Sequence, residues 1–396
     1  MTGTQKVNDF ESLKPHLNQI QTRALVIGLL ALALCVVGAI MSPVQFFRSY
    51  LFAYLFWIGI VLGSFALVAL HHLVGGGWGF AIQRLLESSS WTLPLMVLLI
   101  APLFFGMQEL YIWARSDVVA VDAVLQQKEK YLNVPFFWIR TGAYFIIWML
   151  FIAFLNKWSK DQDRTADASI TSKLQKISGP AILLYVLTVT FSSIDWVMSL
   201  DPHWFSTIFG FVFVIGQALL TLAFAIVVVV MLSDYKPLSD VLARKHFHDL
   251  GNLMMAFVLL WAYISVSQFI IIWSGNLPEE IPWYLHRLHG GWQWLALAIV
   301  IFHFALPFIL LLSRRTKQRK QLLFKVALAM IFMRLVDLFW IVAPNFHPEQ
   351  ISVHWMDVLA PIGIGGIWLA AFIWNLKDKP LLPLNDPRLK EAFQHD

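Results

Sequence analysis

The sequence contains little charge for its length. Of its 396 residues only 13% are charged, whereas 59% are hydrophobic and the mean hydropathy is +0.68. A soluble globular chain is nearer half apolar and a quarter charged. The composition therefore excludes a soluble enzyme, a disordered protein and a nucleic-acid-binding domain. The 18 Trp and 32 Phe residues fit membrane helices with aromatic belts at both interfaces.

Cysteine is almost absent, since Cys35 is the only one. This excludes an internal disulfide, a cysteine-ligated iron–sulfur cluster and a CxxCH haem attachment site. No HxxxH pattern or acid–histidine cluster predicts zinc, and no phosphate loop, nucleophile elbow or Rossmann glycine pattern is present. If the protein takes part in redox chemistry, we expect partner subunits to hold the metal.

Long hydrophobic runs dominate the chain, and about 20 apolar residues suffice to cross a bilayer as a helix. Continuous rather than alternating runs exclude a barrel and predict an all-α integral membrane protein with ten transmembrane helices. The first run begins too far from the N-terminus for a cleaved signal peptide. The predicted spans are Thr22–Met41, Phe47–Val74, Ser90–Trp113, Val134–Asn156, Gly179–Leu200, Phe205–Leu232, Leu250–Trp273, Gly291–Leu312, Gln321–Ala343 and Trp355–Asn375.

Basic residues are distributed unevenly over the predicted loops. Of the 29 Lys and Arg, 22 lie in the two terminal tails and the even-numbered loops, and Arg334 lies inside a span. The positive-inside rule then places both termini in the cytoplasm, and the net charge of +5 is mainly a topology signal. The six on the other side are Arg48, Arg115, Lys128, Lys130, Arg140 and Arg287.

An internal similarity links the second and sixth spans. Ser49–Gly59 and Ser206–Gly216 share the serine, several aromatic positions and a final Ile-Gly. One interpretation is chance similarity among Phe-rich helices. The other is a parallel repeat of four-helix bundles, spans 2–5 (about 47–200) and 6–9 (about 205–343), with two peripheral spans. The membrane domain would cover 22–375, between cytoplasmic tails 1–21 and 376–396.

Several ionisable residues lie inside the spans, where they are costly and usually have partners. One hypothesis is that they are protonatable stations of a proton path, because burial lets a carboxylate hold a proton at neutral pH. Alternatively, Arg334 and Asp337 form a self-neutralising ion pair, Asp195 and Glu109 are solvated near the outer interface, and the histidines are core or interfacial residues. The candidates are His71, His72, Glu109, Asp195, His303, Arg334 and Asp337.

Three stretches carry a resemblance to a known family. They are His71-His-Leu-Val-Gly-Gly-Gly-Trp-Gly79 with Arg84, Asp195-Trp-Val-Met-Ser-Leu-Asp-Pro-His-Trp-Phe-Ser206, and Arg334-Leu-Val-Asp-Leu-Phe-Trp340. Together with the duplicated ten-span pattern, they resemble NrfD-like polysulfide-reductase membrane subunits. More specifically, they resemble the F subunits of bacterial alternative complex III.

This resemblance implies a membrane subunit of a quinol:cytochrome c oxidoreductase in the electron transport chain of a bacterial inner membrane. The implied partners are a paralogous C-type membrane subunit, an iron–sulfur B subunit, multihaem and monohaem cytochromes c, other small membrane subunits and lipids. The haem and iron–sulfur centres would lie in those partners, and the family is often labelled quinone-binding.

We expect the subunit to anchor the complex and to conduct protons coupled to quinol oxidation by its partners, as an accessory rather than a catalytic subunit. The alternative is a secondary transporter or ion-conducting protein that acts alone. Transporters usually contain paired helix breaks in both repeats. Here Pro94, Pro102 and Pro180 interrupt spans without counterparts at equivalent positions.

Overall fold

The computed structural model describes residues 8–165, 167–383 and 385–389. Within them, ten helices are long and apolar enough to span a membrane, which confirms the predicted all-α membrane fold. Parts of the two predicted tails, residues 1–7, 384 and 390–396, lie outside the described residues. The spans are Phe10–Met41, Pro43–Val74, Gly77–Phe105, Val134–Thr165, Ser169–Leu200, Phe209–Leu232, Arg244–Gly275, Trp292–Leu312, Lys320–Asn345 and Trp355–Lys377.

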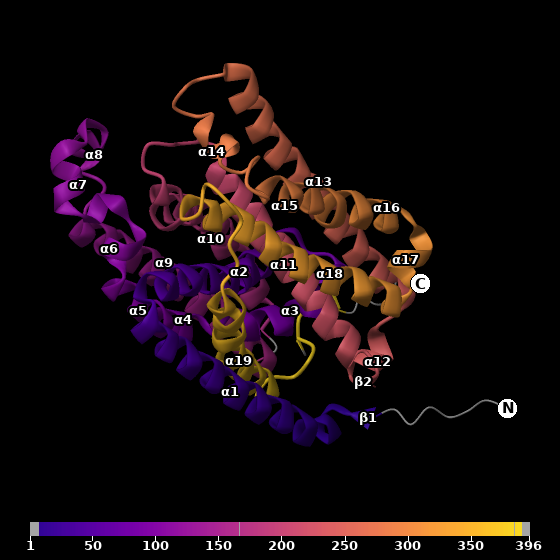
Figure 1. Cartoon of the computed structure of the whole chain (residues 1–396). Coiled ribbons are helices and arrows are strands. Elements are labelled where there is room, and N and C mark those ends of the chain that lie inside the picture. The colour runs from indigo at the N-terminus through magenta and orange to yellow at the C-terminus, as the bar shows by residue number, and fades with distance from the viewer. Residues whose placement is uncertain (1–7, 166, 384, 390–396) are drawn as a thin grey trace.

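Several of these spans are single helices, and others are built from shorter pieces (Figure 1). The single helices are α1 (Phe10–Met41), α2 (Pro43–Val74), α9 (Val134–Thr165), α11 (Phe209–Leu232), α13 (Arg244–Gly275) and α19 (Trp355–Lys377). Span three consists of α3 (Gly77–Ser90), α4 (Leu93–Leu99) and α5 (Ala101–Phe105). Span five combines α10 (Ser169–Trp196) with η2 (Met198–Leu200). Span eight combines α15 (Trp292–Ala298), η3 (Ile299–Ala305) and α16 (Leu306–Leu312). Span nine combines α18 (Lys320–Val342) with η4 (Ala343–Asn345).

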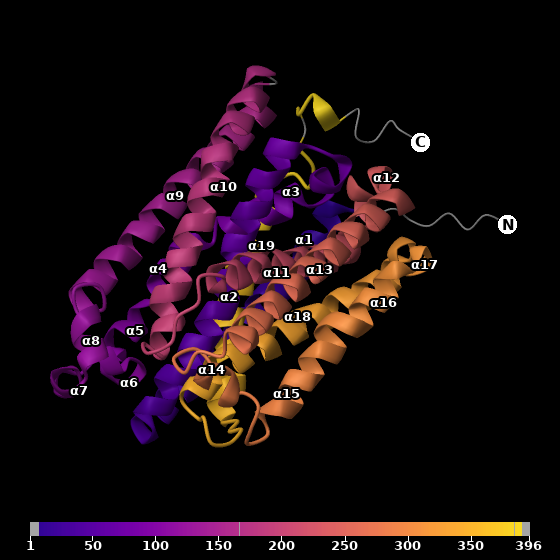
Figure 2. The same cartoon turned by 90° about the horizontal axis from the view of Figure 1, so that it is seen from above.

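Short connecting elements mark the two ends of the bundle (Figure 2). The start of α1, α12 (Leu238–Val241) and α17 (Arg314–Gln318) lie at one end, which we call the terminal face. There β1 (Asn8–Asp9) pairs in parallel with β2 (Tyr235–Lys236). The other end, the opposite face, carries α6 (Met107–Leu110), η1 (Ile112–Ala114), α7 (Ser116–Val121), α8 (Ala123–Lys128) and α14 (Pro282–Leu285).

The centre of the bundle is the contact between α2 and α11. These are the most buried spans, since 94% and 78% of the residues in their most apolar 18-residue stretches are buried. Gly63 of α2 allows this close approach. A Cβ atom there would lie 2.2 Å from the hydroxyl oxygen of Thr221 on α11. By contrast, only 22% of the residues in the corresponding stretch of α1 are buried. This helix packs at the periphery against α19, which also contacts α2.

The helix contacts follow the predicted repeat. In the first unit α2 packs against α3 and α10, and in the second unit α11 packs against the corresponding α13 and α18. The fourth helix of each unit also contacts the third, as α10 contacts α9 and α18 contacts η3. The same neighbours recur in the same order, which favours a duplicated four-helix unit over chance similarity.

The third span begins earlier than predicted. The sequence suggested Ser90–Trp113, whereas the helix already starts at Gly77. Hydropathy alone missed this start because Gln83, Arg84 and Glu87 lower the local average. These side chains are nevertheless buried, because they bond to one another and because Arg84 and Glu87 also bond to α9.

Candidate functional site

The buried polar side chains gather in three clusters. One, which we call the terminal-side cluster, lies toward the terminal face and combines side chains of α3 and α9 with the segment after α19. The other two are arginine–aspartate pairs near the opposite face, one in each repeat. The members are Arg84, Glu87, Ser159, Asp163 and Lys379 in the terminal-side cluster, Arg140 and Asp195 in the repeat-A pair, and Arg334 and Asp337 in the repeat-B pair.

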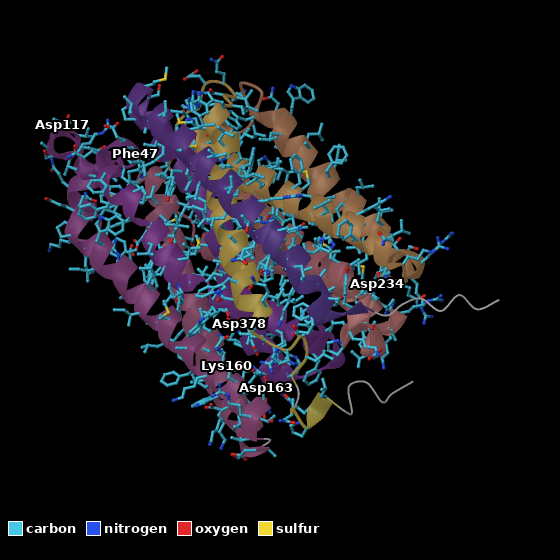
Figure 3. The ribbon with its side chains drawn as sticks, turned by 90° about the horizontal axis from the view of Figure 1, so that it is seen from below. Phe47, Asp117, Lys160, Asp163, Asp234 and Asp378 are labelled. Carbon is cyan, nitrogen blue, oxygen red and sulfur yellow. The ribbon has the colours of Figure 1, made fainter. Side chains whose placement is uncertain are left out.

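The terminal-side cluster is centred on Arg84, of which 1% is exposed. Its guanidinium donates to the Glu87 carboxylate at 2.7 Å, to the Ser159 hydroxyl at 2.7 Å and to both oxygens of Asp163 at 2.5 Å. Ser159 in turn donates to Glu87 at 2.6 Å. Two carboxylates therefore share one arginine. Asp163 lies near the end of the bundle away from Asp117 of α7 (Figure 3).

Lys379 adds a second cation to this cluster. Its ammonium nitrogen lies 3.8 Å from the Glu87 carboxylate and donates to the Asn156 amide oxygen at 2.8 Å. Burial lowers the pKa of Lys379 from 10.5 to about 8, although the Glu87 charge partly offsets this shift. The lysine can therefore bind or release a proton near neutral pH.

His71 and His72 lie at the end of α2, beside this cluster. Both rings are buried, and neither has a hydrogen-bond partner among the described residues. The glycine run that follows them has two roles. Gly75 and Gly76 turn the chain at φ of 76° and 99°, and a Cβ at Gly79 would lie 1.9 Å from the His71 ring.

The repeat-A pair joins α9 and α10. Arg140 donates to both oxygens of Asp195 at 2.9 Å, and the Tyr144 hydroxyl donates to the same carboxylate at 2.7 Å. Arg140 also donates to the Tyr131 carbonyl at 2.8 Å and lies 3.9 Å from the centre of that tyrosine ring. Asp195 is fully buried. It is therefore an ion-paired core residue rather than a group solvated at the interface.

The repeat-B pair lies within α18. Arg334 donates to Asp337 one helical turn later, which is the predicted i, i+3 ion pair. The guanidinium lies over Gly216 of α11, where a Cβ atom would approach it to 2.3 Å. Unlike Arg140, Arg334 makes no further hydrogen bond within the described chain, and its Nε atom lacks a partner there. Asp337 is thus its one charge partner among these residues.

His303 lies close to the repeat-B pair on the π-helical segment η3. Its ring packs edge to face against Trp261, with the ring centroids 4.1 Å apart. The imidazole is also close enough to the Arg334 guanidinium to feel its positive charge. Both ring nitrogens are buried without a hydrogen-bond partner in the described residues. π-Helical turns often occur at functional sites, because the wider turn redirects side chains.

An aromatic cleft of about 400 Å³ opens beside this pair. It lies between α11, α13, α14, α15, η3 and α18, and its walls include Trp261, Trp283 and Tyr284. Asp337, Gln268 and Ser265 supply polar side chains to a largely apolar surface. The volume lies within the range of small-molecule sites.

The structure groups six of the seven predicted site residues near the three clusters. The seventh, Glu109 in α6, is half-buried, and no side-chain hydrogen bond or ion pair joins it to the other described residues. It therefore belongs to none of the clusters.

Six of the nine cluster members were absent from the sequence-based candidates, namely Arg84, Glu87, Ser159, Asp163, Lys379 and Arg140. Arg140 was assigned to the outer loops, Glu87 preceded the predicted third span, and Lys379 was counted as part of a basic tail. An arginine six residues into a predicted span was a signal for Arg140, because an unpaired charge there is costly. The sequence offered no comparable signal for Lys379.

Groups of three or more His, Cys, Asp or Glu residues that could hold a metal ion do not occur among the described residues. No family model and no curated protein matches this chain.

Proposed function

We propose that this chain is a membrane subunit of a quinol:cytochrome c oxidoreductase of the alternative complex III type. In this proposal it anchors the complex and conducts protons, while partner subunits carry the electrons. The observation that carries the proposal is the distribution of buried ionisable groups. One cluster lies toward the terminal face, and a carboxylate–arginine pair lies toward the opposite face in each repeat.

The clusters have the chemistry of gated proton stations. In each pair a guanidinium is bound to a buried carboxylate, so a movement of the arginine would change the electrostatic surroundings of Asp195 or Asp337. A redox change in a partner subunit that displaced the arginine would therefore switch the proton affinity of the acid. On the other side, Lys379 can exchange a proton with the terminal face.

Polar groups also lie between the clusters. The hydroxyls of Ser64 on α2 and Ser89 on α3 form a hydrogen bond of 2.8 Å, two helical turns from His71. Deeper in the bundle the Tyr185 hydroxyl donates to the Gln217 side chain at 2.9 Å. These groups support two half-channels that meet near the middle of the bundle, rather than an open pore.

The three stretches that resemble the F subunits coincide with these clusters. His71–Gly79 with Arg84 contributes to the terminal side, Asp195–Ser206 begins with the repeat-A acid, and Arg334–Trp340 holds the repeat-B pair. This coincidence supports the proposed family role. By the positive-inside rule, the terminal face would be the cytoplasmic side of a bacterial inner membrane.

The same proposal assigns the haem and iron–sulfur centres to the cytochrome c and B subunits, beside a paralogous C-type subunit. If this subunit also binds quinone, the aromatic cleft next to Asp337 fits best in size and lining. Gln268 and Tyr284 would then offer hydrogen-bonding groups to the quinone ring.

Purification from native membranes in mild detergent tests the assembly. We expect the chain to co-isolate in fixed stoichiometry with an iron–sulfur protein and a multihaem cytochrome c. A monomeric protein that transports a solute by itself would instead support the transporter alternative. Span three is built from three shorter helices, whereas its counterpart in the second repeat, α13, is a single helix, and this difference argues against that alternative.

Proton measurements on the assembled complex test the path. Asp195→Asn should lower the number of protons moved per electron, or the turnover, in a complex that still assembles. The control is Glu129→Gln, an exposed carboxyl near the opposite face, which should leave both unchanged. Normal proton stoichiometry in Asp195→Asn would remove this acid from the path, and loss of assembly would assign it a structural role.

A further inference from the structure

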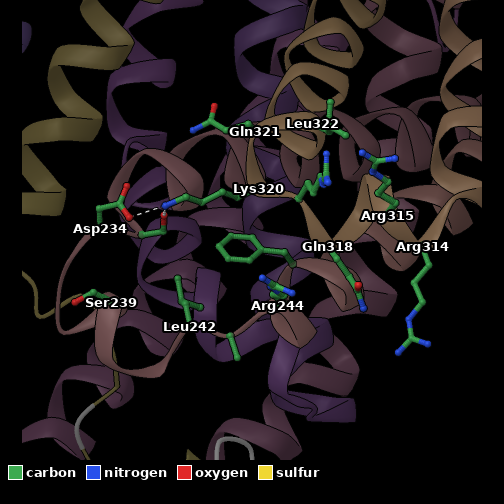
Figure 4. A pocket seen from close by; sticks show the side chains of 14 residues that line it. Asp234, Ser239, Leu242, Arg244, Arg314, Arg315, Gln318, Lys320, Gln321 and Leu322 are labelled. Atoms are coloured by element: carbon green, nitrogen blue, oxygen red, sulfur yellow. Dashed lines mark hydrogen bonds and ion pairs between the residues drawn. The ribbon is translucent and has the colours of Figure 1, made fainter. Parts of the chain in front are cut away.

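A large basic cleft opens at the terminal face, apart from the three polar clusters. Its volume is about 1250 Å³, and it lies between the segment leading into α13 and the turn formed by α17 and the start of α18 (Figure 4). Five cationic side chains and one carboxylate line it. They are Arg244, Arg314, Arg315, Arg319, Lys320 and Asp234.

Most of this positive charge is not neutralised. Lys320 forms an ion pair with Asp234 at 2.5 Å, as Figure 4 shows. Within the described chain, none of the four arginines has a carboxylate within ion-pair distance, and all four are exposed. An anion in the cleft would therefore meet several unpaired guanidinium groups, each of which can donate two parallel hydrogen bonds to a phosphate.

The cleft lies at the boundary between charged and apolar surface. Arg244 and Lys320 are the first residues of membrane-spanning helices, and Arg314 follows the end of another. Apolar side chains begin at once beside them, because Leu322 is 37% and Leu312 is 57% exposed. A ligand with an anionic head and an apolar body would match both surfaces.

The geometry goes beyond what membrane topology requires. The positive-inside rule concerns only the number of basic residues on one side of the membrane. It does not require residues from two distant segments, Arg244 and the stretch Arg314–Lys320, to converge on one concavity with Phe247 and Leu242 in its wall. Basic pockets between membrane helices on the cytoplasmic side are typical binding sites for anionic lipid head groups. The positive-inside rule would place the terminal face on that side.

We propose that this cleft binds the phosphate head group of an anionic phospholipid from the leaflet at the terminal face. The exposed arginines hold the phosphate oxygens, and the acyl chains run along the exposed leucines of α16 and α18. A head group with two phosphates, as in cardiolipin, can form ion pairs with more of the four arginines than a head group with one phosphate. This inference does not depend on the proposed respiratory function.

Native mass spectrometry of the purified full-length protein provides the test. The protein is incubated with cardiolipin, phosphatidylglycerol or phosphatidylcholine, and retained lipid is counted. We expect retention to fall in the order cardiolipin, phosphatidylglycerol, phosphatidylcholine. Each basic residue near a membrane surface contributes about fivefold to such binding, so Arg315→Gln with Arg319→Gln should weaken cardiolipin retention by roughly 25-fold.

The matched control replaces two exposed arginines outside the cleft, Arg23→Gln with Arg164→Gln, and should leave retention unchanged. If the double variant misfolds, single Arg315→Gln and Arg319→Gln variants should each lose about fivefold. Equal retention of phosphatidylcholine, or equal losses in the control, would overturn the proposal. So would full displacement of cardiolipin by inorganic phosphate at equal concentration, because this would identify a site for free phosphate.

Discussion

The two arginine–aspartate pairs should respond differently to loss of their acids. Asp337→Asn leaves Arg334 charged and buried, and the described residues offer this arginine no other charge partner. Breaking a buried ion pair by removing one partner costs about 3–5 kcal/mol. We therefore expect Asp337→Asn to lower the free energy of unfolding by about this amount.

Asp195→Asn should cost less, about 1–3 kcal/mol, the price of lost hydrogen bonds to a charged group. Arg140 retains its bond to the Tyr131 carbonyl, and its guanidinium lies 3.9 Å and 4.4 Å from the ring centres of Tyr131 and Phe136. Its side chain is also 10% exposed, so some solvent reaches the charge. The two variants should thus differ by about 2 kcal/mol.

Unfolding in mixed micelles, followed by tryptophan fluorescence as the denaturing detergent increases, measures this difference. Equal losses in the two variants, or a larger loss for Asp195→Asn, would refute the reasoning. The double variant Arg334→Met with Asp337→Leu removes both charges at similar volume, and it should recover most of the lost stability. If the pair is also a proton station, stability returns in this double variant but proton transfer does not.

Three further predictions follow from the same geometry. Because the pKa of Lys379 falls to about 8 on folding, this residue binds more protons in the unfolded chain than in the folded chain between pH 8 and 10.5. Its contribution to stability should therefore rise with pH across that interval, and Lys379→Gln should reduce the rise in pH-dependent unfolding measurements. Gly79→Ala should displace the His71 ring and lower the melting temperature, whereas Gly142→Ala, with no atom within 4 Å of its added Cβ, should not. Tyr144→Phe removes one hydrogen bond to the repeat-A acid and should cost about 1.5–3 kcal/mol in the same unfolding assay; no change would mean that this bond contributes nothing.

The number and kind of membrane helices could be predicted from the sequence. Each span must satisfy its own backbone hydrogen bonds and present an apolar surface to lipid, and both requirements are local. The Arg334–Asp337 pair was equally predictable, because residues three apart on a helix lie on the same face. The shared pattern of Ser49–Gly59 and Ser206–Gly216 predicted a duplicated unit, which the recurring helix contacts favour.

Helix ends were harder to predict where polar residues are buried. The third span was placed too late because Arg84 and Glu87 lower the hydropathy of its first turns. Hydropathy assigns a fixed cost to each charge, whereas the actual cost depends on partners. Here those partners come from α9 and from the segment after α19.

The sequence by itself determined that this protein is a ten-helix membrane protein whose few internal charges are the places to look for function. Only the tertiary structure decided how those charges are paired. Asp195 meets Arg140 from another helix, 55 positions away in the chain, and Glu87 meets Lys379 from the far end of the sequence. The tertiary structure also brought Arg244 next to Arg314–Lys320 in one cleft. The physical reason is that partner choice depends on which helix faces meet, and helix packing is a property of the assembled bundle rather than of any single span.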